Sequence, residues 1–174
     1  AESWQADPAA KTLTIKLKSD AKFASGNPVR PEDVIYSYVR AVTLNKSGAF
    51  ILNVLGWQPE NIASQLKKID DHTVQVQWSA DVSPALALNI LSTPIASIVD
   101  EKLVAPNAKN NDFGNEWLKM HSAGSGAFKM RTYQPHQAIV REANASSPTG
   151  APKLKNVIIK NVPDPATRRL LIQQ

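Results

Sequence analysis

The stretch Phe23-Ala24-Ser25-Gly26-Asn27-Pro28-Val29-Arg30-Pro31-Glu32-Asp33-Val34-Ile35-Tyr36-Ser37 joins a turn to the start of a helix. Residues 25–28 have the composition of a turn. Proline is favoured at the first helical position, and two acidic residues next to it suit the positive end of a helix, so we predict a helix that begins at Pro31. Its buried stripe is expected to contain Val34, Ile35, Tyr38, Val39 and Val42.

Strand patterns lie on both sides of this helix. Residues 12–18 alternate apolar and polar side chains, which is typical of a half-buried strand. Residues 66–79 predict a hairpin that turns at 70–72 and places Val74, Val76 and Trp78 on one face. A second hairpin is predicted from residues 127–133 and 138–142, and Val157-Ile158-Ile159 predicts a buried strand. Strands that alternate with helices indicate an α/β fold.

Further helices are predicted from their capping residues. Ser83 and Pro84 begin a helix that continues to Leu91, and Asp164 caps a final helix that continues to Gln174. Short helical turns are expected at 100–104 and 116–118. Residues 45–56 are predicted to be irregular, because Ser47-Gly48 interrupts any periodicity. No stop signal follows the last helix, so we expect the natural chain to continue.

The amino-acid composition limits the classes of protein to which the chain can belong. The 174 residues fit one ordinary domain, with 43% hydrophobic and 20% charged residues. The sequence has no cysteine, which excludes disulfides, thiolate zinc sites and cysteine nucleophiles. The net charge of +5 invites a nucleic-acid-binding hypothesis, but the basic residues are spread along the chain and not clustered. No apolar run approaches the roughly 20 residues of a membrane span.

Most of the residue patterns that are typical of catalytic, metal-binding or phosphate-binding sites are absent from the sequence. The three histidines, His72, His121 and His136, are not spaced as a helical metal pair, and Gly124-Ser125-Gly126 matches neither a nucleophile elbow nor a P-loop. We therefore predict no enzymatic activity, no metal and no cofactor. Two interpretations stay open for the aromatic residues Phe50 and Trp57: they line a ligand cleft, or their loop packs over the core.

Several motifs follow one another in a recognisable order. Besides residues 23–37, they are Ala1-Glu2-Ser3-Trp4, Ile69-Asp70-Asp71-His72-Thr73-Val74-Gln75-Val76, Gly124-Ser125-Gly126-Ala127-Phe128 and Val162-Pro163-Asp164-Pro165-Ala166-Thr167-Arg168-Arg169. Together they resemble the family 5 solute-binding proteins, which bind dipeptides, oligopeptides, nickel chelates, haem or related small ligands for ABC importers. Each motif alone is weak, but the series covers essentially the whole chain.

The resemblance implies a fold and a domain division. It points to an α/β, type II periplasmic-binding-protein-like lobe with a mixed sheet and short helices, incomplete at both ends. Residues 1–174 are expected to be a partial first lobe of a two-lobed protein, with 1–115 as a peripheral subdomain and 116–174 returning into the lobe core. The family's acidic anchor for a peptide's amino terminus lies on the second lobe, outside this chain.

The same resemblance implies a function and ligand contacts. The protein is expected to be a periplasmic, monomeric substrate-binding component of an ABC importer that captures a small peptide or related solute by lobe closure. Ligand contacts are expected from Phe50, Thr93 and Ala96. Nickel binders of the family place a tryptophan and an arginine in these two neighbourhoods, and their absence here argues against an anionic chelate. The alternatives are a basic nucleic-acid-binding module and a small hydrolase built around His121 or Ser125.

Overall fold

The computed structural model describes residues 1–173, the side chain of Ser47 excepted. Gln174, the last residue of the predicted final helix, lies outside the described residues. The strands of this part of the chain are β1 (Ser3–Asp7), β2 (Thr12–Lys16), β3 (Leu66–Lys68), β4 (Thr73–Gln77), β5 (Phe128–Gln134), β6 (Ala138–Ala143) and β7 (Asn156–Lys160). Its α-helices are α1 (Pro31–Leu44), α2 (Phe50–Asn53), α3 (Pro84–Leu91), α4 (Glu101–Val104), α5 (Asn115–Leu118) and α6 (Pro165–Gln173). Short 3-10 turns are η1 (Ser47–Ala49), η2 (Ile62–Gln65), η3 (Pro94–Ala96) and η4 (Ala105–Asn107).

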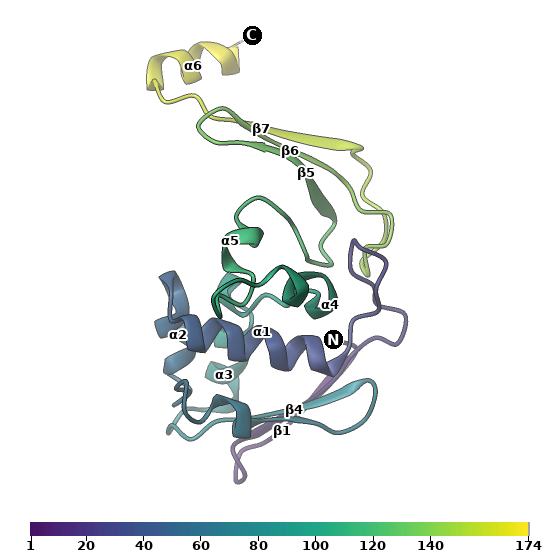
Figure 1. Ribbon diagram of the computed structural model, residues 1–174, viewed down its shortest axis with the longest axis vertical. Coiled ribbons are helices and arrows are strands. Elements are labelled where there is room, and N and C mark those ends of the chain that lie inside the picture. Colours follow the sequence, from purple (N-terminus) through teal and green to yellow (C-terminus); the bar gives the residue numbers. More distant parts are fainter. Residues whose placement is uncertain (174) are drawn as a thin grey trace.

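The first four strands form one sheet in the order β1-β2-β4-β3, and α1 lies across it (Figure 1). Leu13 of β2 pairs with Val76 of β4, and Val76 pairs in turn with Leu66 of β3. These three side chains are buried, because alternate residues of a strand point to the same face and this face is covered. The predicted strand at 12–18 and the hairpin at 66–79 are confirmed.

Helix α1 begins at Pro31, as predicted. Its first turn is closed by a reciprocal cap between Arg30 and Asp33, and Asn45 in the left-handed conformation follows its last residue. Within the predicted stripe, Val34, Tyr38 and Val42 are buried; Ile35 and Val39 are partly buried and pack against the same cluster. The amphipathic pattern therefore gives the position of the helix on the sheet.

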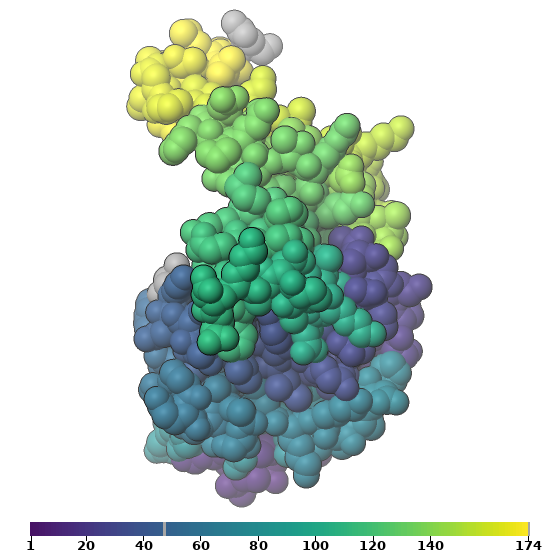
Figure 2. Space-filling view, in the orientation of Figure 1, coloured from purple at the N-terminus to yellow at the C-terminus, as the bar shows by residue number. Residues whose placement is uncertain are grey.

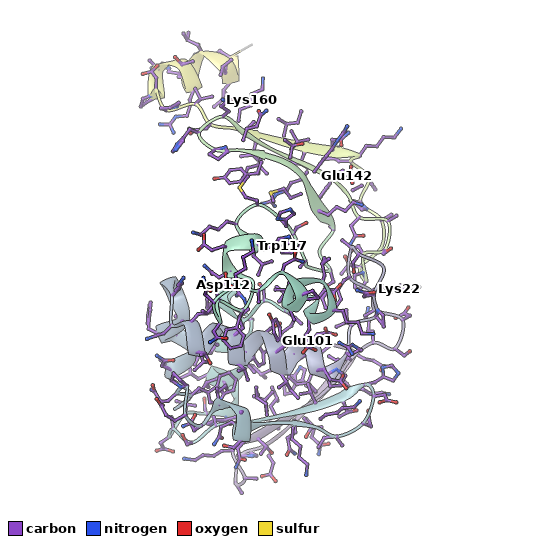
Figure 3. All side chains as sticks on the ribbon, in the orientation of Figure 1. Lys22, Glu101, Asp112, Trp117, Glu142 and Lys160 are labelled. Atoms are coloured by element: carbon purple, nitrogen blue, oxygen red, sulfur yellow. The ribbon has the colours of Figure 1, made fainter. Side chains whose placement is uncertain are left out.

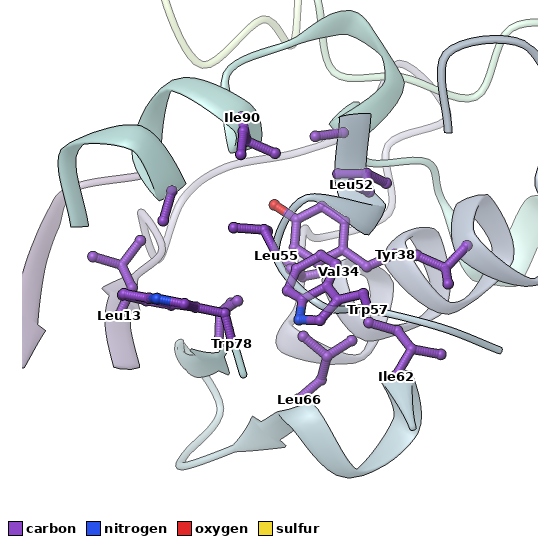
Figure 4. Close-up of a cluster of buried hydrophobic side chains, with 14 of the residues drawn as sticks. Leu13, Val34, Tyr38, Leu52, Leu55, Trp57, Ile62, Leu66, Trp78 and Ile90 are labelled. Carbon is purple, nitrogen blue, oxygen red and sulfur yellow. The ribbon is translucent and has the colours of Figure 1, made fainter. Parts of the chain in front are cut away.

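Two tryptophans, Trp57 and Trp78, belong to the cluster of buried hydrophobic side chains (Figure 4). Trp57 is fully buried and donates its indole N–H to the Gln77 carbonyl at 2.8 Å. Trp78 is 2% exposed and donates to the Val82 carbonyl at 3.2 Å. Core packing is thus confirmed for Trp78, and for Trp57 the interpretation as a cleft-lining residue is wrong. A buried indole needs a hydrogen-bond acceptor, and both have one.

Residues 45–56 are more regular than predicted. They form η1 and α2, so the expectation of an irregular segment is wrong. Leu52 and Leu55 are fully buried, and their packing holds the short helical turn that the local sequence does not specify by itself.

The strands β5, β6 and β7 form a second sheet in that order. Figure 2 shows this sheet and α6 projecting from the rest of the chain. The predicted hairpin at 127–142 and the strand at 157–159 are confirmed, but the prediction that the latter is buried is wrong, since Ile158 is 60% exposed. Among the strands of residues 1–173, β7 lies at the edge of the sheet and pairs with β6 alone.

The fold combines helices and sheets, as expected for an α/β protein, and its sheets are antiparallel. The resemblance to the family implied a mixed sheet, and every strand pair in residues 1–173 is antiparallel. Four of these pairs, β1–β2, β3–β4, β5–β6 and β6–β7, join strands that are consecutive along the chain, which favours antiparallel pairing; β2 and β4 are not consecutive and are antiparallel as well.

The buried phenol of Tyr38 gives a testable pH dependence. Burial raises the pKa of Tyr38 to about 12, whereas an unfolded chain releases this proton near pH 10. As the pH rises above 10, the unfolded chain therefore releases this proton before the folded chain does. We expect the free energy of unfolding to fall by up to about 2 kcal/mol between pH 10 and 12 because of Tyr38. Urea unfolding at pH 8 and pH 11.5 measures the loss.

The matched variants for this experiment are Tyr38→Phe and Tyr133→Phe. Tyr38→Phe should lose less stability between the two pH values than the parent chain, and Tyr133→Phe, at a half-buried position, should follow the parent. Equal losses in the parent and Tyr38→Phe would contradict the prediction.

Candidate functional site

The stretch at residues 23–37 holds a buried carboxylate at its centre. Asp33 is 1% exposed. Its carboxylate accepts hydrogen bonds from the Arg30 backbone N–H at 2.8 Å, from the Arg30 guanidinium at 3.2 and 3.3 Å, and from the Glu101 N–H at 3.0 Å. The hydrogen bond to Asp33 is the main cause that raises the pKa of Arg30. This carboxylate joins the start of α1 to the start of α4.

A second buried carboxylate completes the connection. Asp100 is 1% exposed and accepts from the Ser25 hydroxyl at 2.6 Å and the Asn27 amide at 2.8 Å. It also caps α4 by accepting from the Leu103 N–H at 3.3 Å. Each of these two buried carboxylates accepts several hydrogen bonds from the protein, as buried charged groups need to do. The motif therefore fastens the turn at 23–28 to residues 100–103, which is a structural role.

The segments predicted to contact a ligand lie beside one another. A Cβ placed on Gly48 would lie 3.7 Å from the Ile51 side chain and 3.9 Å from that of Ile95, so η1 and α2 adjoin η3. The structure thus brings together two stretches that are at least 40 positions apart in the sequence, 47–53 and 93–96.

Within this pair of segments the three candidate residues differ in accessibility. The Phe50 side chain is 67% exposed. Thr93 is half-buried, and its hydroxyl donates to the Ile90 carbonyl at 2.6 Å. Ala96 is 4% exposed and belongs to the core cluster. The three residues remain predictions.

A hollow of about 410 Å³ lies between α5 and β5. Its walls come from residues 24–25, Leu103, Trp117, residues 120–122 and residues 129–131, and we call it the α5–β5 hollow. Trp117 is labelled in Figure 3, on α5 and below the second sheet. Sequence reasoning considered one wall residue, His121, in the hydrolase alternative, but it did not predict a ligand hollow here, because the walls come from segments up to 107 positions apart.

An aromatic pair and a strand irregularity shape the α5–β5 hollow. The rings of Trp117 and His121 are parallel within 1°, with centroids 4.2 Å apart, and His121 Nδ1 lies 2.8 Å from the Trp117 carbonyl. On β5, Met130 pairs with Arg141 and Thr132 with Val140, so Arg131 has no partner in the register. The i, i+4 spacing of Trp117 and His121 is visible in the sequence, but the irregularity is not.

Other site types have little support in the described residues. No group of three or more histidine, aspartate or glutamate side chains among residues 1–173 is arranged to hold a metal ion. None of the helices in this range has the length and apolar character needed to cross a bilayer.

The comparisons with known proteins identify the family. The model for bacterial extracellular solute-binding proteins, family 5 middle, matches residues 1–174. The chain belongs to this family. Its relatives are named as solute- or peptide-binding proteins, and the expectation of a type II periplasmic-binding-protein fold is confirmed.

Individual family 5 proteins are similar over nearly the whole chain. The "Probable D,D-dipeptide-binding periplasmic protein DdpA" of Escherichia coli strain K12 is 30% identical over 174 residues, which are 100% of this chain and 31% of that protein. The periplasmic oligopeptide-binding protein OppA of the same strain is 30% identical over 170 residues, covering 91% of this chain and 29% of OppA. The solved structure of MoaA from A. tumefaciens R10 in complex with mannopinic acid has a TM-score of 0.77 at 25% identity, covering 99% of this chain and 32% of MoaA.

The present chain spans about a third of the length of these family 5 relatives. The described residues therefore correspond to part of the binding protein that the relatives form.

Proposed function

We propose that this chain is part of the substrate-binding component of an ABC importer that captures a small peptide or related solute. The observation that carries the proposal is the family match over all 174 residues, together with 30% identity to proteins named for dipeptide and oligopeptide binding. Residues 1–115 would form the peripheral subdomain of the first lobe, and residues 116–174 would return into the lobe core.

The proposed mechanism is binding without chemistry. A ligand bridges two lobes, its higher affinity for the closed state shifts the population toward closure, and the closed form docks on the importer. For a peptide, main-chain hydrogen bonds supply affinity, while wet side-chain pockets tolerate sequence variety. An exposed aromatic side chain, Phe50, beside a second loop at 93–96 supports a ligand surface at this place.

The setting of this function is the periplasm, as for the relatives named as periplasmic proteins. We propose a monomer that works with the membrane subunits of the importer and does not bind nucleic acid. No comparison favours the nucleic-acid-binding alternative.

A thermal-shift series on the full-length protein tests the function. A ligand present at 100 times its dissociation constant stabilises the native state by about 2.7 kcal/mol. We expect dipeptides or short oligopeptides to raise the melting temperature in a concentration-dependent way. Stabilisation by duplex DNA alone, lost as salt increases, would favour the nucleic-acid alternative. No stabilisation by any peptide would refute peptide capture.

Phe50 provides a residue-level test of the ligand surface. Because its side chain is 67% exposed, Phe50→Ala should leave stability nearly unchanged. Loss of an aromatic contact should weaken peptide binding by about tenfold. Isothermal titration calorimetry measures both proteins. The control is Ile172→Ala, which removes an 85% exposed apolar side chain from α6 and should bind as the parent does. Equal affinities for all three would remove Phe50 from the ligand surface.

A further inference from the structure

The α5–β5 hollow has the size and lining of a small-molecule site. Its volume of about 410 Å³ falls in the usual range of roughly 300–1,000 Å³ for such sites. The Trp117–His121 stack gives it a flat aromatic surface, and Met120 and Met130 add polarisable side chains. Among the described residues, no aspartate or glutamate lines it.

A β-bulge turns a run of β5 toward the α5–β5 hollow. Consecutive residues of a regular strand point to opposite faces, yet Lys129, Met130 and Arg131 all line the hollow. The register shift at Arg131 explains this, because an extra residue bends the strand and re-aims its side chains. The Met130 N–H is donated at 3.1 Å to the Ser122 hydroxyl on the opposite wall.

The charge of the α5–β5 hollow comes from Arg131. Lys129 lies 3.1 Å from Glu142 on the neighbouring strand, so its charge is balanced. Arg131 is exposed and forms no ion pair within residues 1–173. A guanidinium offers a planar fork of donors that matches a carboxylate.

The polar groups beside the Trp117–His121 stack can form hydrogen bonds with a peptide amide that lies next to a bound carboxylate. A carbonyl oxygen only accepts hydrogen bonds, so His121 Nδ1, which lies 2.8 Å from the Trp117 carbonyl, carries the hydrogen. In the neutral ring Nε2 is then an acceptor, able to receive a peptide N–H. The Ser122 hydroxyl, which accepts from Met130, keeps its own hydrogen to donate.

We propose that the α5–β5 hollow binds the carboxylate end of a small solute such as a short peptide. Arg131 forms an ion pair with the carboxylate, and the solute's last side chain packs on the Trp117–His121 stack. The proposal rests on the proposed function and adds to it a position and an orientation for the ligand. It differs from the Phe50 surface, which lies on α2.

The test compares one dipeptide with its amide. Alanyl-phenylalanine and its carboxy-terminal amide differ by the carboxylate charge, and Arg131→Gln removes the charge of the arginine at an exposed position. We expect the parent protein to bind the dipeptide about fivefold to tenfold more tightly than the amide, and Arg131→Gln to lose that preference. Calorimetry on the full-length protein gives the affinities. The Trp117 indole resonance, assigned with Trp117→Phe, should move at an about fivefold to tenfold lower concentration of the dipeptide than of its amide.

The matched control is Arg168→Gln, which removes an exposed arginine from α6 at the far end of the chain (Figure 1). It should keep the preference of the parent. If the parent binds both probes equally, or if Arg131→Gln keeps the preference, the proposal is wrong while peptide capture stands. If inorganic phosphate alone binds in an Arg131-dependent way, the carboxylate assignment is wrong. If neither probe binds and no peptide shifts the melting temperature, the proposed function fails as well.

Discussion

Replacing Trp57 with alanine is expected to lower the free energy of unfolding by about 4 kcal/mol, the middle of the range for truncating a buried aromatic residue. Trp57 has no exposed surface, and its ring lies 5.5 Å from that of Tyr38 at an angle of 38°. The substitution removes these contacts and leaves a cavity between α1 and the first sheet. It also takes away the donor that the Gln77 carbonyl uses. Urea unfolding followed by far-UV circular dichroism measures the loss.

Two further variants separate the contributions of Trp57. Trp57→Phe keeps most of the ring but loses the hydrogen bond, so we expect a loss of about 1.5 kcal/mol. Trp4→Ala removes a tryptophan that is 56% exposed on the edge strand β1, and should cost less than about 1 kcal/mol. A Trp57→Ala chain as stable as the Trp4→Ala chain would show that the core does not depend on this ring.

Replacing Asp33 with alanine is expected to lower the free energy of unfolding by about 3 kcal/mol, because several donors lose their acceptor at once. The N–H groups of Arg30 and Glu101 lose their acceptor, and the Arg30 guanidinium loses its buried partner. The Arg30 side chain is 26% exposed and can recover part of its hydration, which keeps the cost below that of a fully buried pair. The same unfolding experiment gives the value.

The matched variants for Asp33 change charge and position separately. Asp33→Asn keeps the shape and one acceptor oxygen, so about half of the loss is expected. Asp81→Ala removes a fully exposed carboxylate that lies 3.6 Å from Lys11, and should not change stability measurably. If Asp33→Ala behaves like Asp81→Ala, the connection between α1 and α4 does not stabilise the fold.

The sequence predicted the local elements well. The turn at 25–28, the helix beginning at Pro31, the hairpins and the cap at Ser83 are specified by neighbouring residues, and the structure contains them. The sequence missed the helical turn α2, which has only four residues and is held by buried Leu52 and Leu55. It also predicted burial for Ile158, because an apolar run looks the same in a central strand and in an exposed edge strand.

The candidate sites were less accessible to sequence reasoning. The neighbourhood of Phe50 and Thr93 came from the resemblance to a family, and no pattern in the residues indicated that the two segments adjoin. The α5–β5 hollow was not predicted as a ligand site, although one of its wall residues, His121, was considered for the hydrolase alternative. A bulge at Arg131 depends on how β5 pairs with β6, and pairing is a contact between strands.

By itself the sequence determined what depends on residues close together in the chain: the caps, the turns, the periodicity of α1 and β2, and the series of motifs that indicated the family. Only the tertiary structure decided which side chains meet. It showed that Asp33 and Asp100 fasten the turn at 23–28 to α4, and that Trp57 belongs to the core. The physical reason is that burial and hydrogen bonding depend on which distant segments come into contact, and local preferences do not encode that choice.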